Sequence, residues 1–128
     1  MRILLDTHAF LWFLLNDTRL SGPGRDAIID PLNEVEISPA SYWEIAIKIA
    51  LRKYALPEPY QVFMEREIAE NHFHILPIEP KHTAVLTTLA MHHRDPFDRL
   101  IVSQAMVEGI PLVSGDTALD AYAITRLW

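Results

Sequence analysis

The chain alternates between short apolar runs and longer segments in which apolar residues recur at helical spacing. Four runs have the length of strands and end at polar or turn residues, namely Arg2–Leu5, Val35–Ile37, His74–Ile78 and Ile110–Ser114. Their nearly continuous apolar character predicts strands that are buried on both faces, as in a parallel sheet. A further edge strand is expected within Ile124–Trp128.

Segments with helical periodicity separate these strands. Helices are expected over Ala9–Leu15, around Ala27–Ile29, after Ser38-Pro39, from Val62 to Ala69, over Pro80–Met91, and from Asp95 to Gly109. The helix after Pro39 is expected to face the core through Tyr42, Trp43, Ile45, Ala46, Ile49 and Ala50. Strands joined in this way predict a single α/β domain over residues 1–128, a three-layer α/β/α sandwich with a mainly parallel sheet of four to five strands.

The helix after Asp95 has the clearest start signal. Asp95 is placed to cap it, and Pro96 takes its first position. Asp98 follows three residues after the cap, so both acids sit beside free backbone N–H groups. The buried side of this helix is expected to comprise Leu100, Ile101, Ala105 and Val107.

Four acids are predicted to meet at one edge of the sheet. Asp6 and Asp116 each follow an apolar strand, so both emerge at the carboxyl ends of parallel strands, where such folds bind ligands. Glu44 lies near the start of a helix that leaves this edge, and the Asp98 helix, which precedes a strand, also begins there. Each acid alone fits a helix cap or a turn, but the coincidence of all four favours chemistry.

Four neighbouring carboxylates repel one another, and a divalent cation would remove that conflict. Oxygen-only ligands favour Mg²⁺ or Mn²⁺ over Zn²⁺, and the natural chemistry is hydrolysis of a phosphodiester. Thr7 and Ser114 adjoin the acids and are expected to orient a water or a carboxylate. Arg99 and Lys48 are expected to contact phosphate or to partner the acids.

Composition limits which binding partners and which cellular compartment are expected. The formal net charge of −6 argues against a generic polyanion-binding surface, so nucleic acid would need local basic clusters or bound cations. The absence of cysteine excludes disulfides and thiolate sites and fits a reducing compartment. Asp6 interrupts any signal peptide and the run Ala9–Leu15 is too short to cross a bilayer, so a cytoplasmic protein without membrane contact is expected.

The histidines and large aromatic residues have ordinary structural interpretations. His8 is expected beside the pocket, whereas the other five histidines, including the adjacent His92 and His93, are expected on the surface or at an interface. The aromatic residues of the dense apolar runs are expected in the core or at a dimer interface and not as base-stacking groups; these are Phe10, Trp12, Phe13 and Trp43.

Four segments resemble, in order, the motif blocks of PIN-domain ribonucleases, and most of all those of VapC-like toxins from toxin–antitoxin pairs: Leu4–His8, Ser41–Lys48, Asp95–Leu100 and Leu112–Asp116. The resemblance implies catalytic, metal-binding acids at Asp6, Glu44, Asp98 and Asp116, with Thr7 and Ser114 as supporting hydroxyls. It also implies cleavage of RNA with Mg²⁺ or Mn²⁺, a homodimer, and neutralisation by a cognate antitoxin that covers or enters the acidic pocket. Asp95 belongs to the Asp-Pro-Phe-Asp string of the toxin branch, while Asp98 matches the general family pattern.

Two other function classes remain open at this point. A receiver-like signalling domain also has a parallel sheet and an acidic Mg²⁺ pocket, but it needs paired acids after the first strand and a lysine after the last core strand. Here Asp6 stands alone, and Gly115-Asp116-Thr117 offers no lysine. A non-catalytic module whose acids bind a basic protein segment would differ from a nuclease only in lacking turnover.

Overall fold

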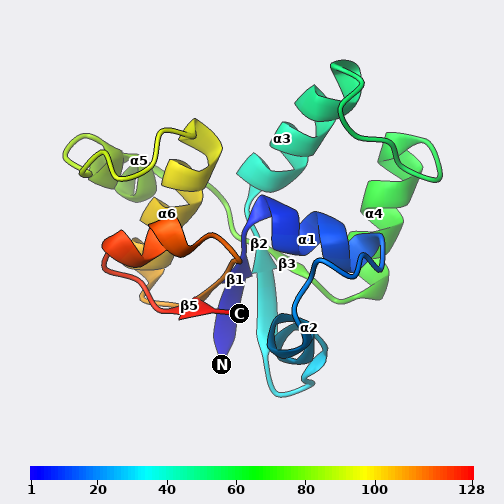
Figure 1. The fold of residues 1–128 in the computed structure, drawn as a ribbon, viewed down its shortest axis with the longest axis horizontal. Helices are drawn as coiled ribbons and strands as arrows, with labels where there is room; N and C mark the ends of the chain where they lie inside the picture. Colours follow the sequence, from blue (N-terminus) through cyan, green and yellow to red (C-terminus); the bar gives the residue numbers. More distant parts are fainter.

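A five-stranded parallel sheet lies between two layers of helices in the computed structural model, which describes residues 1–128 (Figure 1). The strands are β1 (Arg2–Leu5), β2 (Glu34–Ile37), β3 (His74–Ile75), β4 (Leu112–Val113) and β5 (Arg126–Leu127). Their order is β3-β2-β1-β4-β5, and every neighbouring pair is parallel. The predicted three-layer α/β/α architecture is therefore confirmed, including the edge strand near the carboxyl end.

The helices begin and end where the sequence supplies caps. They are α1 (Thr7–Leu14), α2 (Gly22–Ile29), α3 (Pro39–Ala50), α4 (Tyr60–Glu70), α5 (Pro80–Leu86) and α6 (Pro96–Glu108), with a 3₁₀ turn η1 (Thr117–Ala121). Side chains of Asp6, Ser21, Ser38 and Asp95 accept backbone N–H bonds at the starts of α1, α2, α3 and α6. Gly109, at φ 65°, ends α6 in the left-handed conformation. None of these helices has the length and apolar character that crossing a bilayer requires.

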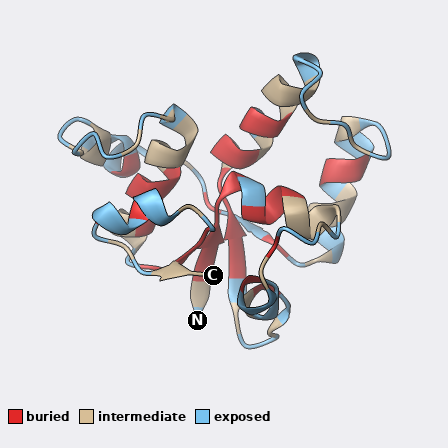
Figure 2. Ribbon diagram, viewed as in Figure 1, coloured by how far each residue is buried: buried red, intermediate tan, exposed pale blue.

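Residues on the central strand β1 alternate between two apolar clusters, one on each face of the sheet. Ile3 and Leu5 belong to a cluster with residues of α1, α2, α3 and α4. Leu4 belongs to the other, together with Ile101 and Val102 of α6. Figure 2 shows the buried residues concentrated in the strands and in the helix faces turned toward them. The sheet is thus covered on both sides, which explains why its strands read as continuous apolar runs.

Helix α5 is shorter than predicted, ending at Leu86 and not at Met91. Backbone groups of the following loop bond to side chains from elsewhere in the fold. The Arg99 guanidinium donates to the carbonyls of Leu89, Ala90 and His93, and the Tyr122 hydroxyl also donates to Ala90. These tertiary partners replace the hydrogen bonds that a longer helix would have made. Strands β3 and β4 are also shorter than predicted; Pro77 and Pro111, which lack an N–H, lie beside them.

The buried face of α3 differs from the predicted one. Trp43 is 58% exposed and Ala50 is also exposed, although both were expected to face the core. The buried positions are Ala40, Ser41, Glu44 and Ile45, which lie on one helical face. Two of these four are polar because this part of the face points to the polar end of the sheet. The pattern of apolar residues alone therefore predicted the wrong buried face.

A polar network joins α5, α6 and β1 at the amino ends of the strands, away from the candidate acids. His82 is fully buried, so the expectation that it lies on the surface or at an interface is wrong. It accepts the Glu79 N–H at Nδ1 (2.9 Å), so its proton lies on Nε2, 2.9 Å from Glu108 Oε2. Arg2 and Lys81 also approach Glu108, at 3.1 Å and 3.2 Å. Hydrogen bonds from His82 and Arg2 lower the pKa of Glu108 to about 2.

We predict that Glu108→Gln lowers the free energy of unfolding at pH 7 by about 1–3 kcal/mol, because charge-assisted hydrogen bonds are lost. The folded pKa is depressed, so the wild-type advantage is complete above the ordinary glutamate pKa of 4.5 and disappears as the pH falls toward about 2. Urea unfolding at pH 7, 4.5 and 3 measures this. Glu70→Gln, an exposed acid without an ion pair, is the control; an equal loss at pH 7 and pH 3 would contradict the prediction.

Candidate metal centre

The candidate acids lie where the chain switches direction in the sheet. From β1 the chain moves to β2 on one side and later returns as β4 on the other. Asp6 follows β1 directly, and its N–H donates to the carbonyl of Val113 at the end of β4 (3.0 Å). Asp116 lies three residues beyond Val113. Ligand crevices in parallel sheets form outside the carboxyl ends of strands at such a switch point.

The carboxylate of Asp6 is fixed in position, and its negative charge is poorly neutralised by its surroundings. It is 5% exposed, and one carboxylate oxygen caps α1 by accepting the Ala9 N–H (2.8 Å). Burial is the main cause that raises the pKa of Asp6. Hydrogen bonds from Ser114 and Ala9 and the charge of His8 lower this pKa, and the charge of Asp116 adds a smaller raising effect. The protein therefore keeps a buried carboxylate here without a matching cation of its own.

Asp98 lies in the first turn of α6, and the charges of several other acids raise its pKa. Burial is the largest cause that raises its pKa, to about 7, followed by the charges of Asp95 and Asp6, while Glu44 adds to the effect and His93 opposes it. Asp6, Glu44 and Asp98 come from three distant segments, so this mutual influence means that the fold brings them together.

Glu44 carries the clearest sign of a missing partner. The residue is 4% exposed, and its Oε1 atom is buried without any hydrogen-bond partner. Its Oε2 atom lies 3.4 Å from the Nζ atom of Lys48, one helical turn later, so Lys48 does partner an acid as expected. A buried unpaired carboxylate oxygen is costly, and a cation would satisfy it.

His93 also belongs to this cluster, so the expectation that it lies on the surface or at an interface is wrong. Its Nε2 atom lies 2.8 Å from Asp116 Oδ2 and 3.4 Å from Asp98 Oδ2, and these three atoms all lie within 4.8 Å of one another. Its Nδ1 atom accepts the Asp95 N–H (3.1 Å), which places the proton on Nε2, pointing at Asp116. The only sequence signal was its position just before the Asp95 cap.

The supporting residues divide between the site and its surroundings. Ser114 is fully buried, and its hydroxyl accepts the Asp116 N–H (3.1 Å). Thr7 donates instead to Ser41 (3.3 Å), which fixes the start of α1 against α3. Asp95 caps α6 by accepting the N–H groups of Phe97 and Asp98.

Arg99 forms no ion pair with the acids. Its guanidinium donates to the loop carbonyls of Leu89, Ala90 and His93, so it positions the loop that carries His93. The hypothesis that Arg99 partners the acids was therefore incorrect, because the irregular loop after α5 uses its donors.

A hollow of about 500 Å³ opens beside the acids. Its lining comprises Asp6, His8, Trp12, Arg19, Gly115, Asp116 and Trp128, so His8 is a pocket neighbour as expected. A Cβ atom on Gly115 would lie 2.9 Å from the Trp128 ring, closer than such atoms approach. Glycine between Ser114 and Asp116 thus lets the tryptophan ring pack directly on the backbone of the acidic loop.

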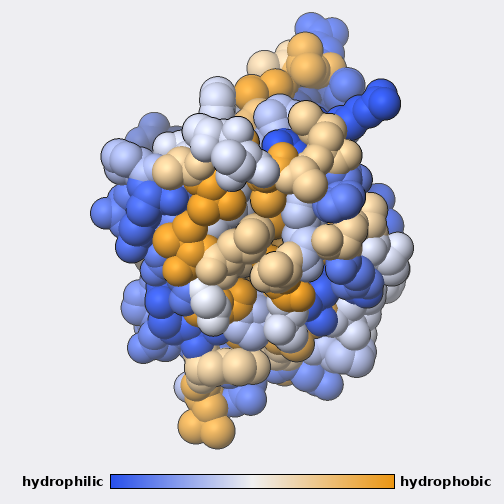
Figure 3. Space-filling model, turned by 90° about the vertical axis from the view of Figure 1, so that its left-hand side faces the viewer, coloured by the Kyte–Doolittle hydropathy of each residue, from blue (hydrophilic) through white to orange (hydrophobic).

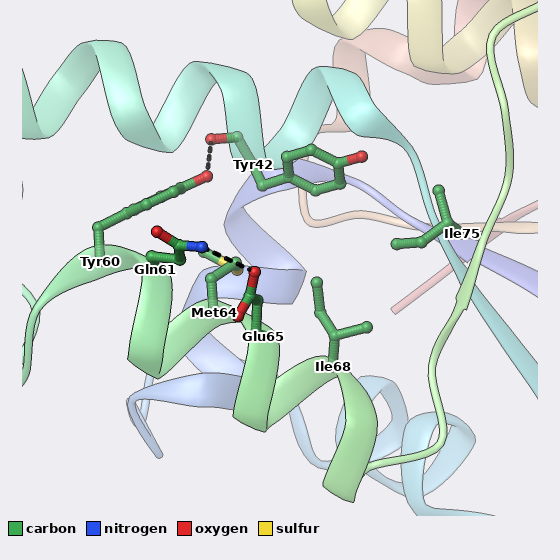
Figure 4. A pocket seen from close by; sticks show the side chains of 7 residues that line it. All are labelled: Tyr42, Tyr60, Gln61, Met64, Glu65, Ile68 and Ile75. Carbon is green, nitrogen blue, oxygen red and sulfur yellow. Dashed lines mark hydrogen bonds between the residues drawn. The ribbon is translucent and has the colours of Figure 1, made fainter.

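An apolar groove between α3 and α4 offers no comparable chemistry (Figure 4). Its lining residues are Tyr42, Tyr60, Gln61, Met64, Glu65, Ile68 and Ile75, around about 330 Å³. Its polar groups satisfy one another: the Tyr60 hydroxyl donates to the Tyr42 carbonyl (2.8 Å), and Gln61 donates to Glu65 (3.1 Å). The acidic cluster is therefore the better candidate for catalysis.

The donor set of this cluster fits a hard divalent cation. His93, Asp98 and Asp116 each place one possible ligand atom within 4.8 Å of the others, and the carboxylates of Asp6 and Glu44 lie close enough to raise the pKa of Asp98. The orphaned Glu44 oxygen and the raised pKa values of Asp6 and Asp98 are what uncompensated ligands would display.

Comparison with known proteins gives a consistent family. A model of the PIN domain matches residues 3–124. Ribonuclease VapC22 of Mycobacterium tuberculosis is 29% identical over 125 residues, which cover 97% of this chain and 94% of that protein.

Solved structures share the fold at low sequence identity. VapBC2 from Rickettsia felis, bound to a DNA fragment from its promoter, matches with a TM-score of 0.73 at 16% identity, covering 98% of this chain and 97% of that one. FitAcB from Neisseria gonorrhoeae matches with a TM-score of 0.61 at 17% identity, covering 97% and 95%. Because the family model spans nearly the whole chain, the protein belongs to the PIN domain family, and within it resembles the VapC proteins.

Proposed function

We propose that the protein is a metal-dependent endoribonuclease that hydrolyses RNA phosphodiester bonds, as the toxin of a toxin–antitoxin pair. One observation carries the proposal: carboxylates from separate segments converge at the switch point, and Glu44 keeps a buried oxygen without a partner. The PIN family match and the similarity to Ribonuclease VapC22 support RNA as the substrate.

Asp6, Glu44, Asp98 and Asp116 would hold Mg²⁺ or Mn²⁺. Such an ion polarises a phosphate and lowers the pKa of an attacking water. Without an ion, burial and the neighbouring acids raise the pKa of Asp98 to about 7, so a cation would bind here in competition with a proton. The Nε2 proton of His93 holds Asp116 in position, and the Ser114 hydroxyl holds the backbone of the same loop.

The family match removes the receiver-like alternative, which belongs to a different fold family. A non-catalytic acidic module remains the competing hypothesis, and turnover separates the two. RNA cleavage in Mg²⁺ or Mn²⁺ that stops in EDTA would support the nuclease, whereas binding without turnover would support the module.

An antitoxin protein is the proposed partner. Solved relatives of this fold include the VapBC-1 assembly from nontypeable Haemophilus influenzae, with a TM-score of 0.66. The net charge of −6 and the acidic mouth would attract a basic segment of such a partner.

A homodimer is also proposed. Figure 3 looks onto the side formed by α5, α6 and η1, where apolar residues gather at the centre and hydrophilic ones surround them. Partly exposed members of the second apolar cluster include Leu89, Leu100 and Met106. An apolar area with a polar rim is typical of subunit interfaces.

We predict that Asp6→Asn and Asp98→Asn each reduce RNA cleavage by at least about 100-fold, because each removes a ligand charge from the metal site. Initial cleavage rates of purified protein in Mg²⁺ and in Mn²⁺, with EDTA as blank, measure the effect. Asp26→Asn makes the same charge change on the exposed side of α2 and should keep the wild-type rate.

Loss of folding is a separate outcome that thermal melting in EDTA identifies. Asp98→Asn should melt no lower than the wild type at pH 8, because its neighbours and its burial oppose the Asp98 charge. A folded Asp98→Asn variant that retains the wild-type cleavage rate would overturn the proposed function.

A further inference from the structure

We propose that the hollow beside the acids is a subsite for one unpaired nucleotide of the RNA, held by base stacking on the rings of His8, Trp12 and Trp128. This inference rests on the proposed nuclease function and names the feature of the substrate that the site selects.

Aromatic side chains line the hollow together with the acids. The rings of His8 and Trp12 are stacked, with centroids 5.2 Å apart and an angle of 18° between their planes. The Trp128 ring follows at 6.0 Å from Trp12, and the Arg19 guanidinium lies 5.0 Å from the Trp12 ring centre. A volume of about 500 Å³ is of the size that small-molecule sites use.

These rings retain access to solvent. Phe10, on the same helix α1, is fully buried in the core, whereas Trp12 and Trp128 are only partly buried and His8 is exposed. Trp12 does pack against the core cluster, as expected from its apolar surroundings, but it also lines the hollow. Both tryptophans also pack against the core cluster, so His8 contributes the most exposed ring of this aromatic surface.

The aromatic and acidic walls belong to one continuous lining. Asp6 and Asp116 form part of the same hollow, His8 lies two residues after Asp6, and Trp128 packs on Gly115 next to Asp116. A nucleotide whose base contacts the rings therefore has its phosphate within reach of the acids.

Charge makes stacking the more important source of RNA affinity in this molecule. The chain carries a net charge of −6, so its overall field does not attract phosphates. Arg19, the basic residue of the hollow, is already paired with Asp17 at 2.7 Å. Stacking of bases on aromatic rings does not depend on net charge, and it suits single strands, in which bases are free to splay out.

We expect Trp12→Ala and Trp128→Ala to weaken binding of a short single-stranded RNA by about 5- to 100-fold, the range that one lost stacking contact produces. The dissociation constant is measured by fluorescence anisotropy in EDTA, and KM for the same RNA is measured in Mg²⁺. Trp128→Phe keeps an aromatic ring on Gly115 and should restore most of the affinity. Trp43→Ala removes an exposed tryptophan that contacts Phe97 outside the hollow, and should change affinity less than about twofold.

The outcomes separate the two proposals. Folded Trp12 and Trp128 alanine variants whose dissociation constant and KM both stay within twofold of the wild type would overturn the nucleotide subsite, even if RNA is cleaved. Binding of a blunt RNA duplex as tightly as the single strand would also overturn it. A wild-type protein that neither binds nor cleaves RNA would instead overturn the proposed nuclease function.

Discussion

Electrostatic repulsion among carboxylates held at the switch point of a parallel sheet is the constraint on which this structure depends. The positions of Asp6 and Asp116 follow from strand ends, while helix starts place Glu44 and Asp98 at the same edge. Each acid is fixed by a backbone element that the cores hold rigid, so the charges have little freedom to move apart. Burial and the neighbouring charges raise the pKa of Asp98 to about 7, and one Glu44 oxygen is buried without a hydrogen-bond partner.

The rest of the fold must supply the stability that offsets the repulsion among these acids. The two apolar clusters on either face of the sheet supply most of it, and the Glu108 network closes the opposite end. The surroundings of Glu108 and of Asp98 shift the pKa of these two acids in opposite directions. Glu108 has cations and a histidine around it and a lowered pKa, whereas Asp98 has mainly acids around it and a raised one. We therefore interpret Glu108 as part of a structural ion-pair network and Asp98 as part of the proposed ligand set.

Topology made much of the fold and the acid positions predictable. Short apolar strands joined by helices allow few arrangements, and in a parallel sheet the residues after each strand share an edge. The site position of His93 was not predicted because tertiary hydrogen bonds, which leave no local sequence pattern, fix its loop: Arg99 donates to the His93 carbonyl, and the His93 N–H donates to the Tyr122 hydroxyl. Trp43 was expected to face the core because an exposed apolar residue at helical spacing cannot be told, from the sequence, from one that is buried.

The account as a whole requires that a divalent cation sits among the acids. Diffraction from crystals grown with Mn²⁺, recorded for its anomalous signal, locates such an ion directly. We expect a peak about 2 to 2.5 Å from carboxylate oxygens among the proposed ligands Asp6, Glu44, Asp98 and Asp116. Crystals in millimolar Mn²⁺ with no peak between these residues, or with the ion bound only at another surface, would contradict the account.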